Sequence, residues 1–234
     1  MPANRVCPSL HLSSPSRASN RPQNREDILT CQSLGKTILI SLGGSTYTEG
    51  GFTSPSEAST WAANLWAMFG PLDPSSTALR PFGATSVDGV DMAFESTTSN
   101  LAPFAAALRQ RMDASTASTG RRYYISAAPQ CPFPDAAMGD MLGSVGVDFV
   151  GVQFYNNFCG AATFVAGPGG PGNFNLARWD QWARTESPNR AVKVLVGLPG
   201  SPSAAGSGYV EDGQLDALLQ YSKGFASFGG VMVW

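Results

Sequence analysis

From residue 26 onward, segments with helical apolar spacing alternate with short, nearly continuous apolar runs. In the first helical segment Ile28, Leu29 and Leu34 follow this spacing and Gly35 ends it. The pattern predicts helices over 26–35, 55–70, 100–115, 135–145, 175–187 and 212–225, and strands over 36–44, 86–96, 121–130, 147–157, 191–200 and 229–234. Apolar strands that alternate with helices indicate a parallel sheet covered by helices, either doubly wound or closed as a (β/α)8 barrel.

Two features favour the barrel over a nucleotide-binding sheet. The chain contains no GxxxxGKS/T sequence, and the stretch that fits GxGxxG, GPGGPG at 167–172, lies in a Gly/Pro-rich loop, so neither phosphate-binding loop of doubly wound folds is supported. Polar residues instead gather where the strands end, among them Ser45, Glu95, Gln130 and Asn156. The carboxyl ends of the strands form the rim on which barrel enzymes carry their active sites.

Six strands are recognisable, whereas a closed barrel needs eight. The predicted fold class is therefore α/β, an incomplete (β/α)8 TIM barrel that lacks its first two strand units and its final helix. Residues 1–25 are rich in Ser, Pro, Asn and Arg without a period, and we expect an irregular or disordered segment there. Residues 26–234 are expected to form one barrel domain.

Strand alternation separates the side chains of 86–96 into two sets, because successive residues point to opposite faces. One set is Val90, Met92 and Phe94, and the other is Asp91, Ala93 and Glu95. The strand over 147–157 divides in the same way, with Val150, Val152 and Phe154 toward the helices and Gly151, Gln153 and Tyr155 inward. The sequence thus predicts acidic and amide side chains on the inner face of the sheet.

Composition excludes several classes of function. The 234 residues include 15 Lys and Arg against 17 Asp and Glu, and no basic cluster has interleaved aromatic residues, so no nucleic-acid partner is expected. No apolar run approaches the ~18 residues of a membrane helix, and the N-terminus has no apolar core typical of a signal peptide. His11 and the four cysteines form no metal-binding cluster, so we expect neither a metal nor another cofactor.

The sequence DGVDMAFE, residues 88–95, resembles the DGxDxDxE signature of glycoside hydrolase family 18. Further blocks resemble the strands of its class III, hevamine-like chitinases: SLGG (41–44), AAPQCPFPD (127–135), VQFYNN (152–157), GLPGSPSAAGSGYV (197–210) and GGVMVW (229–234). The resemblance covers roughly residues 26–234, and fungal members are the most similar.

This resemblance implies a (β/α)8 barrel that hydrolyses β-1,4-linked N-acetylglucosamine polymers with retention, assisted by the substrate's own N-acetyl group. Glu95 would protonate the leaving oxygen, and we expect it to be desolvated and close to other carboxylates, which favours the protonated acid. Asp91 and Tyr155 would act with it in catalysis. The substrate-binding residues implied by the resemblance are Gln153, Asn156, Trp234, Gly43 and Gly44.

Ala93 departs from the signature, in which an Asp at this position holds and polarises the N-acetyl group. Asp88 and Asp91 are retained, so the series of carboxylates is interrupted at a single position. Loss of a group that orients the internal nucleophile lowers the rate by ~10²-fold or more without loss of binding. Three interpretations stay open: a chitinase weakened by Ala93, a lectin-like chitin-oligosaccharide-binding protein without turnover, and a truncated product that never closes its barrel.

The resemblance also bears on the cysteines, the location and the partners. It implies a disulfide between Cys131 and Cys159, and for Cys31 a partner in the region that the chain lacks, while Cys7 has no counterpart. It further implies an extracellular monomer whose partner is chitin or a chitooligosaccharide, with no membrane association.

Overall fold

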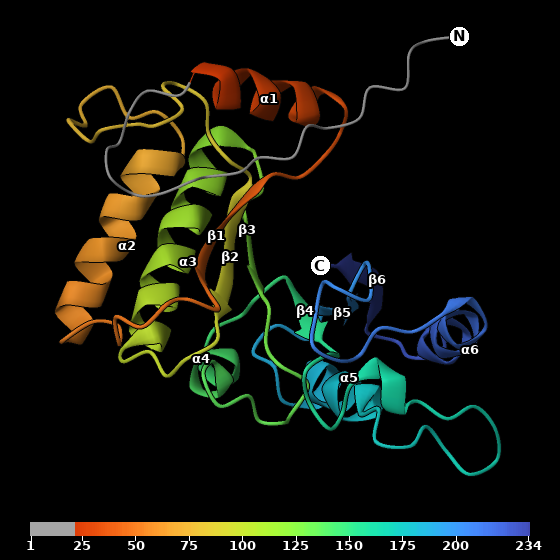
Figure 1. The fold of residues 1–234 in the computed structure, drawn as a ribbon. Coiled ribbons are helices and arrows are strands. Elements are labelled where there is room, and N and C mark those ends of the chain that lie inside the picture. The colour runs from red at the N-terminus through yellow and green to blue at the C-terminus, as the bar shows by residue number, and fades with distance from the viewer. Residues whose placement is uncertain (1–21) are drawn as a thin grey trace, which may run out of the picture.

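One parallel sheet with flanking helices accounts for residues 22–234, the part of the chain that the computed structural model describes (Figure 1). The strands are β1 (Leu39–Gly44), β2 (Gly89–Phe94), β3 (Tyr124–Ala127), β4 (Phe149–Gln153), β5 (Lys193–Leu198) and β6 (Phe228–Val233). They lie side by side in sequence order, and all neighbouring pairs are parallel. The six strands and their parallel order confirm the predicted α/β architecture.

One helix precedes β1 and the others connect successive strands, as the apolar spacing predicts. They are α1 (Pro22–Ser33), α2 (Pro55–Phe69), α3 (Leu101–Thr119), α4 (Gly139–Ser144), α5 (Leu176–Thr185) and α6 (Asp212–Ser222), with a short 3-10 turn η1 (Ala161–Thr163). Figure 1 shows α2 and α3 packed side by side, and α1 lying beyond the ends of the strands. Within residues 22–234 the sheet stays open, because β1 and β6 are its outermost strands.

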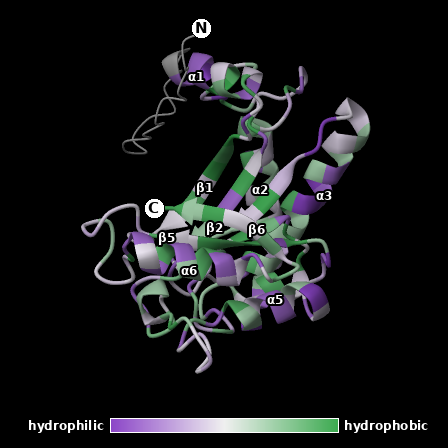
Figure 2. Ribbon diagram, turned by 90° about the vertical axis from the view of Figure 1, so that its right-hand side faces the viewer, coloured by the Kyte–Doolittle hydropathy of each residue, from purple (hydrophilic) through white to green (hydrophobic). Residues whose placement is uncertain are grey.

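The hydrophobic core lies between the sheet and the helices, and Figure 2 shows the strands mostly in the hydrophobic colours with purple residues gathered on the helices. The outward-pointing residues of two strands are buried there: Val90, Met92 and Phe94 of β2, and Val150, Val152 and Phe154 in and just after β4. The faces predicted from alternation are therefore confirmed. The opposite face of the sheet remains available for a site.

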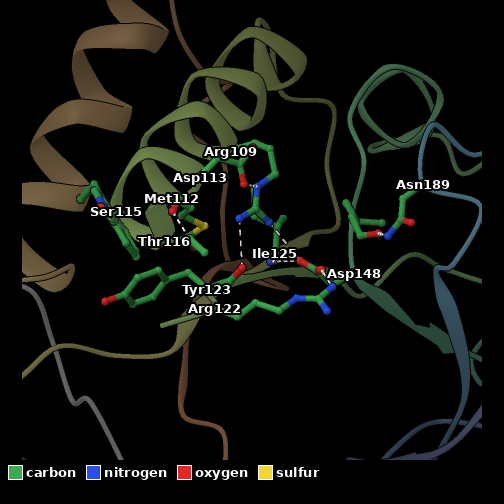
Figure 3. Close-up of polar contacts among 12 residues, drawn as sticks. Arg109, Met112, Asp113, Ser115, Thr116, Arg122, Tyr123, Ile125, Asp148 and Asn189 are labelled. Carbon is green, nitrogen blue, oxygen red and sulfur yellow. Dashed lines mark hydrogen bonds and ion pairs between the residues drawn. The ribbon is translucent and has the colours of Figure 1, made fainter. Parts of the chain in front are cut away.

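Charged side chains join the amino ends of β3 and β4 to α3 (Figure 3). Asp148, just before β4, accepts hydrogen bonds from the Arg109 guanidinium at 3.0 Å, the Arg122 guanidinium at 2.8 Å and the backbone N–H of Ile125 at 2.9 Å. Arg109 also donates to the carbonyl oxygen of Tyr123 at 3.0 Å. These bonds fix the relative position of three elements at the end of the sheet that is remote from the predicted site.

The predicted disulfide between Cys131 and Cys159 is confirmed, with an S–S distance of 2.00 Å. Cys31 is disulfide-bonded too, so the expectation that its partner belongs to an absent region is wrong. The partner of Cys31 lies outside the described residues, as does Cys7. The irregular segment expected over 1–25 falls mostly outside them, but α1 begins at Pro22. Residues 22–25 include no Leu, Ile, Val, Met or Phe, so apolar spacing could not detect this start, although Pro is favoured at the first position of a helix.

Candidate active site

A groove with a volume of about 690 Å³ runs along the inner face of the sheet. This size suits a small-molecule or oligosaccharide site. Every substrate or catalytic residue predicted from the sequence lines it: Gly43, Gly44, Asp91, Ala93, Glu95, Gln153, Tyr155, Asn156 and Trp234. The structure therefore brings together residues that are separated by up to four strands.

Asp91, Ala93 and Glu95 reach the groove because they occupy alternate positions along β2 and just beyond it. Asp91 is held from both sides. The hydroxyl of Ser41, on β1, donates to one carboxylate oxygen at 2.9 Å, and the hydroxyl of Ser126, on β3, donates to the other at 2.6 Å. Asp91 is thus a fixed acceptor at the floor of the groove.

At position 93 only the methyl group of Ala93 faces the groove. Gly43 is the partner of Ala93 in the β1–β2 register, and its φ of +100° lies in the left-handed region that favours glycine. A Cβ atom added at Gly43 would lie 2.8 Å from the carbonyl oxygen of Ala93, so this glycine permits the close approach of the two strands. Gly44, with a φ of +92°, has no atom within 4 Å of such a Cβ, so its backbone faces open groove.

Glu95 and Tyr155 lie at the carboxyl ends of β2 and β4. Tyr155 is buried, with 6% of its surface exposed, and burial together with the negative charge of Glu95 raises the pKa of the Tyr155 hydroxyl to about 12. That hydroxyl is a hydrogen-bond donor at every physiological pH. Glu95 is exposed, so the predicted desolvation of its carboxyl is wrong for this open groove. Only β1 lies beyond β2 in the described sheet, and Glu95 follows the last paired residues there.

Amide and aromatic groups complete the rim. The Gln153 side chain donates to the carbonyl oxygen of Ala128 at 2.8 Å, which orients its amide. Asn156, with a φ of +58°, accepts from the N–H of Ser207 at 3.0 Å and donates its own N–H to the Ser207 carbonyl at 3.2 Å. These two bonds join the loops that follow β4 and β5. Trp234 follows β6 with 69% of its surface exposed, so its ring is available to a ligand.

Two residues of the site were missed by the sequence reasoning. Ser41 and Ser126 reach the groove only because of the register in which β1 and β3 lie beside β2. Their position within each strand was a usable signal, since both fall on inward-facing positions.

Asp88, which the signature groups with the other acids, does not line the groove. It precedes β2 at the amino end and accepts from the N–H of Ile38 at 2.8 Å and from the Gln32 amide at 3.0 Å. It also forms an ion pair with Arg121. Asp88 therefore secures α1, β1 and β3 to the end of the sheet opposite Glu95.

The groove carries a negative electrostatic bias, because its lining in the described chain includes Asp91 and Glu95 and no Lys, Arg or His. Across residues 22–234 no group of three or more His, Cys, Asp and Glu side chains is arranged to hold a metal ion. A polar groove of this kind, with carboxyl, hydroxyl and amide groups and one exposed indole, suits an uncharged or cationic ligand rich in hydroxyl groups.

Comparison with known proteins places these residues in a family. The model of the glycosyl hydrolases family 18 matches residues 6–216. The chain is 51% identical over 213 residues to endochitinase 33 of Trichoderma harzianum, covering 91% of this chain and 65% of that protein. It is 49% identical over 215 residues to a class III chitinase of Arthroderma benhamiae, covering 91% and 64%. The chain thus spans slightly less than two thirds of these relatives.

A solved structure shares the fold. The xylanase and α-amylase inhibitor protein from Scadoxus multiflorus superposes with a TM-score of 0.75 at 29% identity, covering 92% of this chain and 75% of that one. The fold thus also occurs in a protein described as an inhibitor. The family match and the two fungal relatives agree with the signature, and the chain belongs to family 18 of the glycosyl hydrolases.

Proposed function

We propose that the chain binds chitin oligosaccharides in this groove and hydrolyses their β-1,4 linkages slowly. The observation that carries the proposal is the convergence of Glu95, Asp91 and Tyr155 with the rim amides and Trp234 on one face of the sheet. The relatives named chitinase support the choice of substrate.

Glu95 is proposed as the general acid and base. Its carboxylic acid donates a proton to the glycosidic oxygen as the bond to the anomeric carbon breaks, while the substrate's N-acetyl oxygen forms a bond to that carbon. The Tyr155 hydroxyl, which stays protonated, donates a hydrogen bond to the N-acetyl oxygen and orients it. Water then attacks the anomeric carbon, its proton passes to the Glu95 carboxylate, and the N-acetyl group is released with net retention.

Substrate binding is assigned to the rim. The apolar face of a pyranose ring stacks on the exposed indole of Trp234, and the amides of Gln153 and Asn156 hydrogen-bond its hydroxyl groups. Gly44 leaves backbone uncovered at the same level, so a sugar can approach closely.

Ala93 favours a second candidate function. Ala93 lies between Asp91 and Glu95 on the groove face and offers only a methyl group, so no carboxyl at position 93 can orient the N-acetyl group. A groove that keeps its rim and loses this group binds oligosaccharide with little or no turnover, and the chain would then act as a chitooligosaccharide-binding protein.

The disulfide between Cys131 and Cys159 is compatible with an oxidising compartment, and we propose an extracellular monomer. No helix among residues 22–234 is both long and apolar enough to cross a membrane.

Two measurements on the whole chain test these proposals. A thermal melt with and without the N-acetylglucosamine tetramer reports binding, since a ligand of the native state raises the melting temperature. Release of shorter oligomers from the same tetramer reports turnover, with Glu95→Gln as the control that keeps the shape of the side chain. Binding with turnover abolished by Glu95→Gln supports the hydrolase, and binding without turnover supports the binding protein. A melt that the tetramer does not change refutes both.

A further inference from the structure

A row of three polar side chains crosses the floor of the groove. Ser41 on β1 is the register partner of Asp91 on β2, and Asp91 is the partner of Ser126 on β3. Each serine hydroxyl donates to a different oxygen of the Asp91 carboxylate, at 2.9 and 2.6 Å. Rotation of the carboxylate would break at least one of these bonds. Asp91 therefore has one orientation, set by its two neighbouring strands.

The two anchors are unequal. Ser126 is 1% exposed, whereas Ser41 is exposed at the edge strand of the described sheet. Water competes for a hydroxyl donor at an exposed position, and a hydrogen bond to a charged group is stronger where water is excluded. Ser126, with the shorter of the two bonds, is thus the more effective anchor of Asp91.

Position 93, two residues further along β2, determines which group an oriented Asp91 can contact. With a rise of about 3.3 Å per residue, the Cα atoms of Asp91 and Glu95 are separated by about 13 Å, too far for direct contact between their carboxyl groups. A side chain at position 93 would lie about 6.6 Å from each of them along the strand. Asp91 can therefore influence Glu95 only through a group that occupies the level of Ala93.

We propose that Ser126 is a positioning residue that orients Asp91 toward the level of residue 93, and that its effect on turnover depends on a carboxyl being present there. The inference rests on the proposed function and adds to it a residue outside the signature. Each carboxylate oxygen has a second lone pair, so Asp91 can hold both serines and still accept a hydrogen bond from a protonated carboxyl at 93. In the native chain residue 93 is Ala, so the Asp91 carboxylate that Ser126 orients has no carboxyl partner there.

The test is a double-mutant cycle between positions 126 and 93. Ser126→Ala and Ser126→Thr are made in the native chain and in the Ala93→Asp chain, and tetramer hydrolysis is followed against pH. Ser227→Ala is the matched control, because the Ser227 hydroxyl also donates to a buried aspartate, Asp180, at 2.8 Å and lies outside the groove.

In the Ala93→Asp chain, Ser126→Ala should lower kcat about 10-fold, the effect of one hydrogen bond to a charged group, with KM unchanged. The acidic limb of its kcat profile should move to higher pH, because a lost donor makes the carboxyl pair easier to protonate. Ser126→Thr, which keeps the hydroxyl, should retain both the kcat and the pH profile of the Ala93→Asp chain, and Ser227→Ala should change neither. Ser126→Ala should lower kcat less in the native chain than in the Ala93→Asp chain, since no carboxyl occupies position 93 there.

An equal effect of Ser126→Ala in both chains, or an unmoved pH profile, would overturn the proposal. A second readout needs no turnover: the ¹³C resonance of the Asp91 carboxyl group should shift in Ser126→Ala and stay unchanged in Ser227→Ala. If no variant turns over the tetramer, the proposed hydrolase is refuted, and this resonance alone decides whether Ser126 positions Asp91. An unshifted resonance overturns that role whatever the activity.

Discussion

Ala93→Asp should raise the rate at which the chain hydrolyses N-acetylglucosamine oligomers. The new carboxyl would project into the groove from the Cβ position that Ala93 already occupies, so it needs no backbone change. It would stand between Asp91 and Glu95 on the same face of the strand, with about 6.6 Å of strand on either side. A carboxyl at that place can hold the substrate's N-acetyl group and present its oxygen to the anomeric carbon.

The gain is worked from the role of orientation. Misplacing a reacting group by about 1 Å costs about 100-fold in rate, which corresponds to about 2.7 kcal/mol of activation free energy. We therefore expect kcat to rise about 100-fold with little change in KM. The same substitution should cost stability, because the new carboxylate repels Asp91 and Glu95 by about 2.5 kcal/mol each at a separation of about 6.6 Å and an effective dielectric constant of about 20. Partial protonation of these carboxyls reduces this cost.

The assay is tetramer hydrolysis under saturating substrate, with the melting temperature measured on the same samples. Ala204→Asp is the matched control, since Ala204 also lines the groove but lies in the loop after β5, which is separated from β2 by β3 and β4. It adds the same charge to the same groove without placing it between Asp91 and Glu95. If Ala93→Asp folds, binds tetramer and hydrolyses it no faster than the native chain or Ala204→Asp, the orienting role of position 93 is wrong.

Three further outcomes are expected. Asp148→Asn should destabilise the chain by about 3 kcal/mol in urea unfolding, because it leaves the half-buried Arg109 guanidinium without its main anion. Asp113→Asn, which removes a largely exposed partner of Arg109, should cost less than about 1 kcal/mol. Equal losses in the two variants would contradict this difference. Burial alone would raise the pKa of Asp180, but hydrogen bonds from Ser227 and Arg184 outweigh burial and lower it. The stability that the charged Asp180 contributes is present above the unfolded-state pKa and is lost as pH falls through the folded-state pKa. Asp180→Asn should therefore flatten the acid limb of the plot of melting temperature against pH, and an unchanged limb would exclude Asp180 as a source of the pH dependence. Tyr155→Phe should reduce kcat about 10-fold or more with KM nearly unchanged, and the alkaline limb of the native kcat profile should show no step near pH 10, since the pKa of Tyr155 is about 12.

Element types and faces were predictable because they depend on local pattern. A buried parallel strand requires a short apolar run and its helix requires apolar spacing, so β2 and α3 follow from residues next to each other in sequence. The inward position of Glu95 and Tyr155 follows from alternation alone. The beginning of α4 did not follow: the Asp135 side chain accepts from the N–H groups of Ala137 and Met138 and delays the helix to Gly139.

The polar row of the groove could not be predicted in full, because it depends on how strands far apart in sequence are aligned. Shifting β3 by one residue relative to β2 would turn Ser126 to the helix side and remove its bond to Asp91. The exposure of Glu95 has a similar origin, since it depends on how many strands lie beyond β2 and not on the residues around it. Recognised blocks predict which side chains meet, and the register decides how they are bonded.

The two ends of the sheet are held together by different chemistry, and this separates stability from catalysis. At the amino ends, Asp88 and Asp148 each form an ion pair with an arginine and accept a hydrogen bond from a backbone N–H of a neighbouring element. At the carboxyl ends, the groove has hydroxyl and amide anchors and no basic side chain in its described lining.

An arginine beside Glu95 would favour its charged form and oppose its use as an acid, whereas hydroxyl and amide anchors orient side chains without adding charge. The strong ion pairs thus lie where they cannot interfere with proton transfer, as in barrels whose amino face serves stability. Substitutions at Asp148 should therefore change the melting temperature and leave the tetramer-induced shift and kcat intact. Substitutions at Ser126 should lower kcat in the Ala93→Asp chain and leave the tetramer-induced shift intact, and Asp148 variants that lose kcat to the same extent would contradict this division.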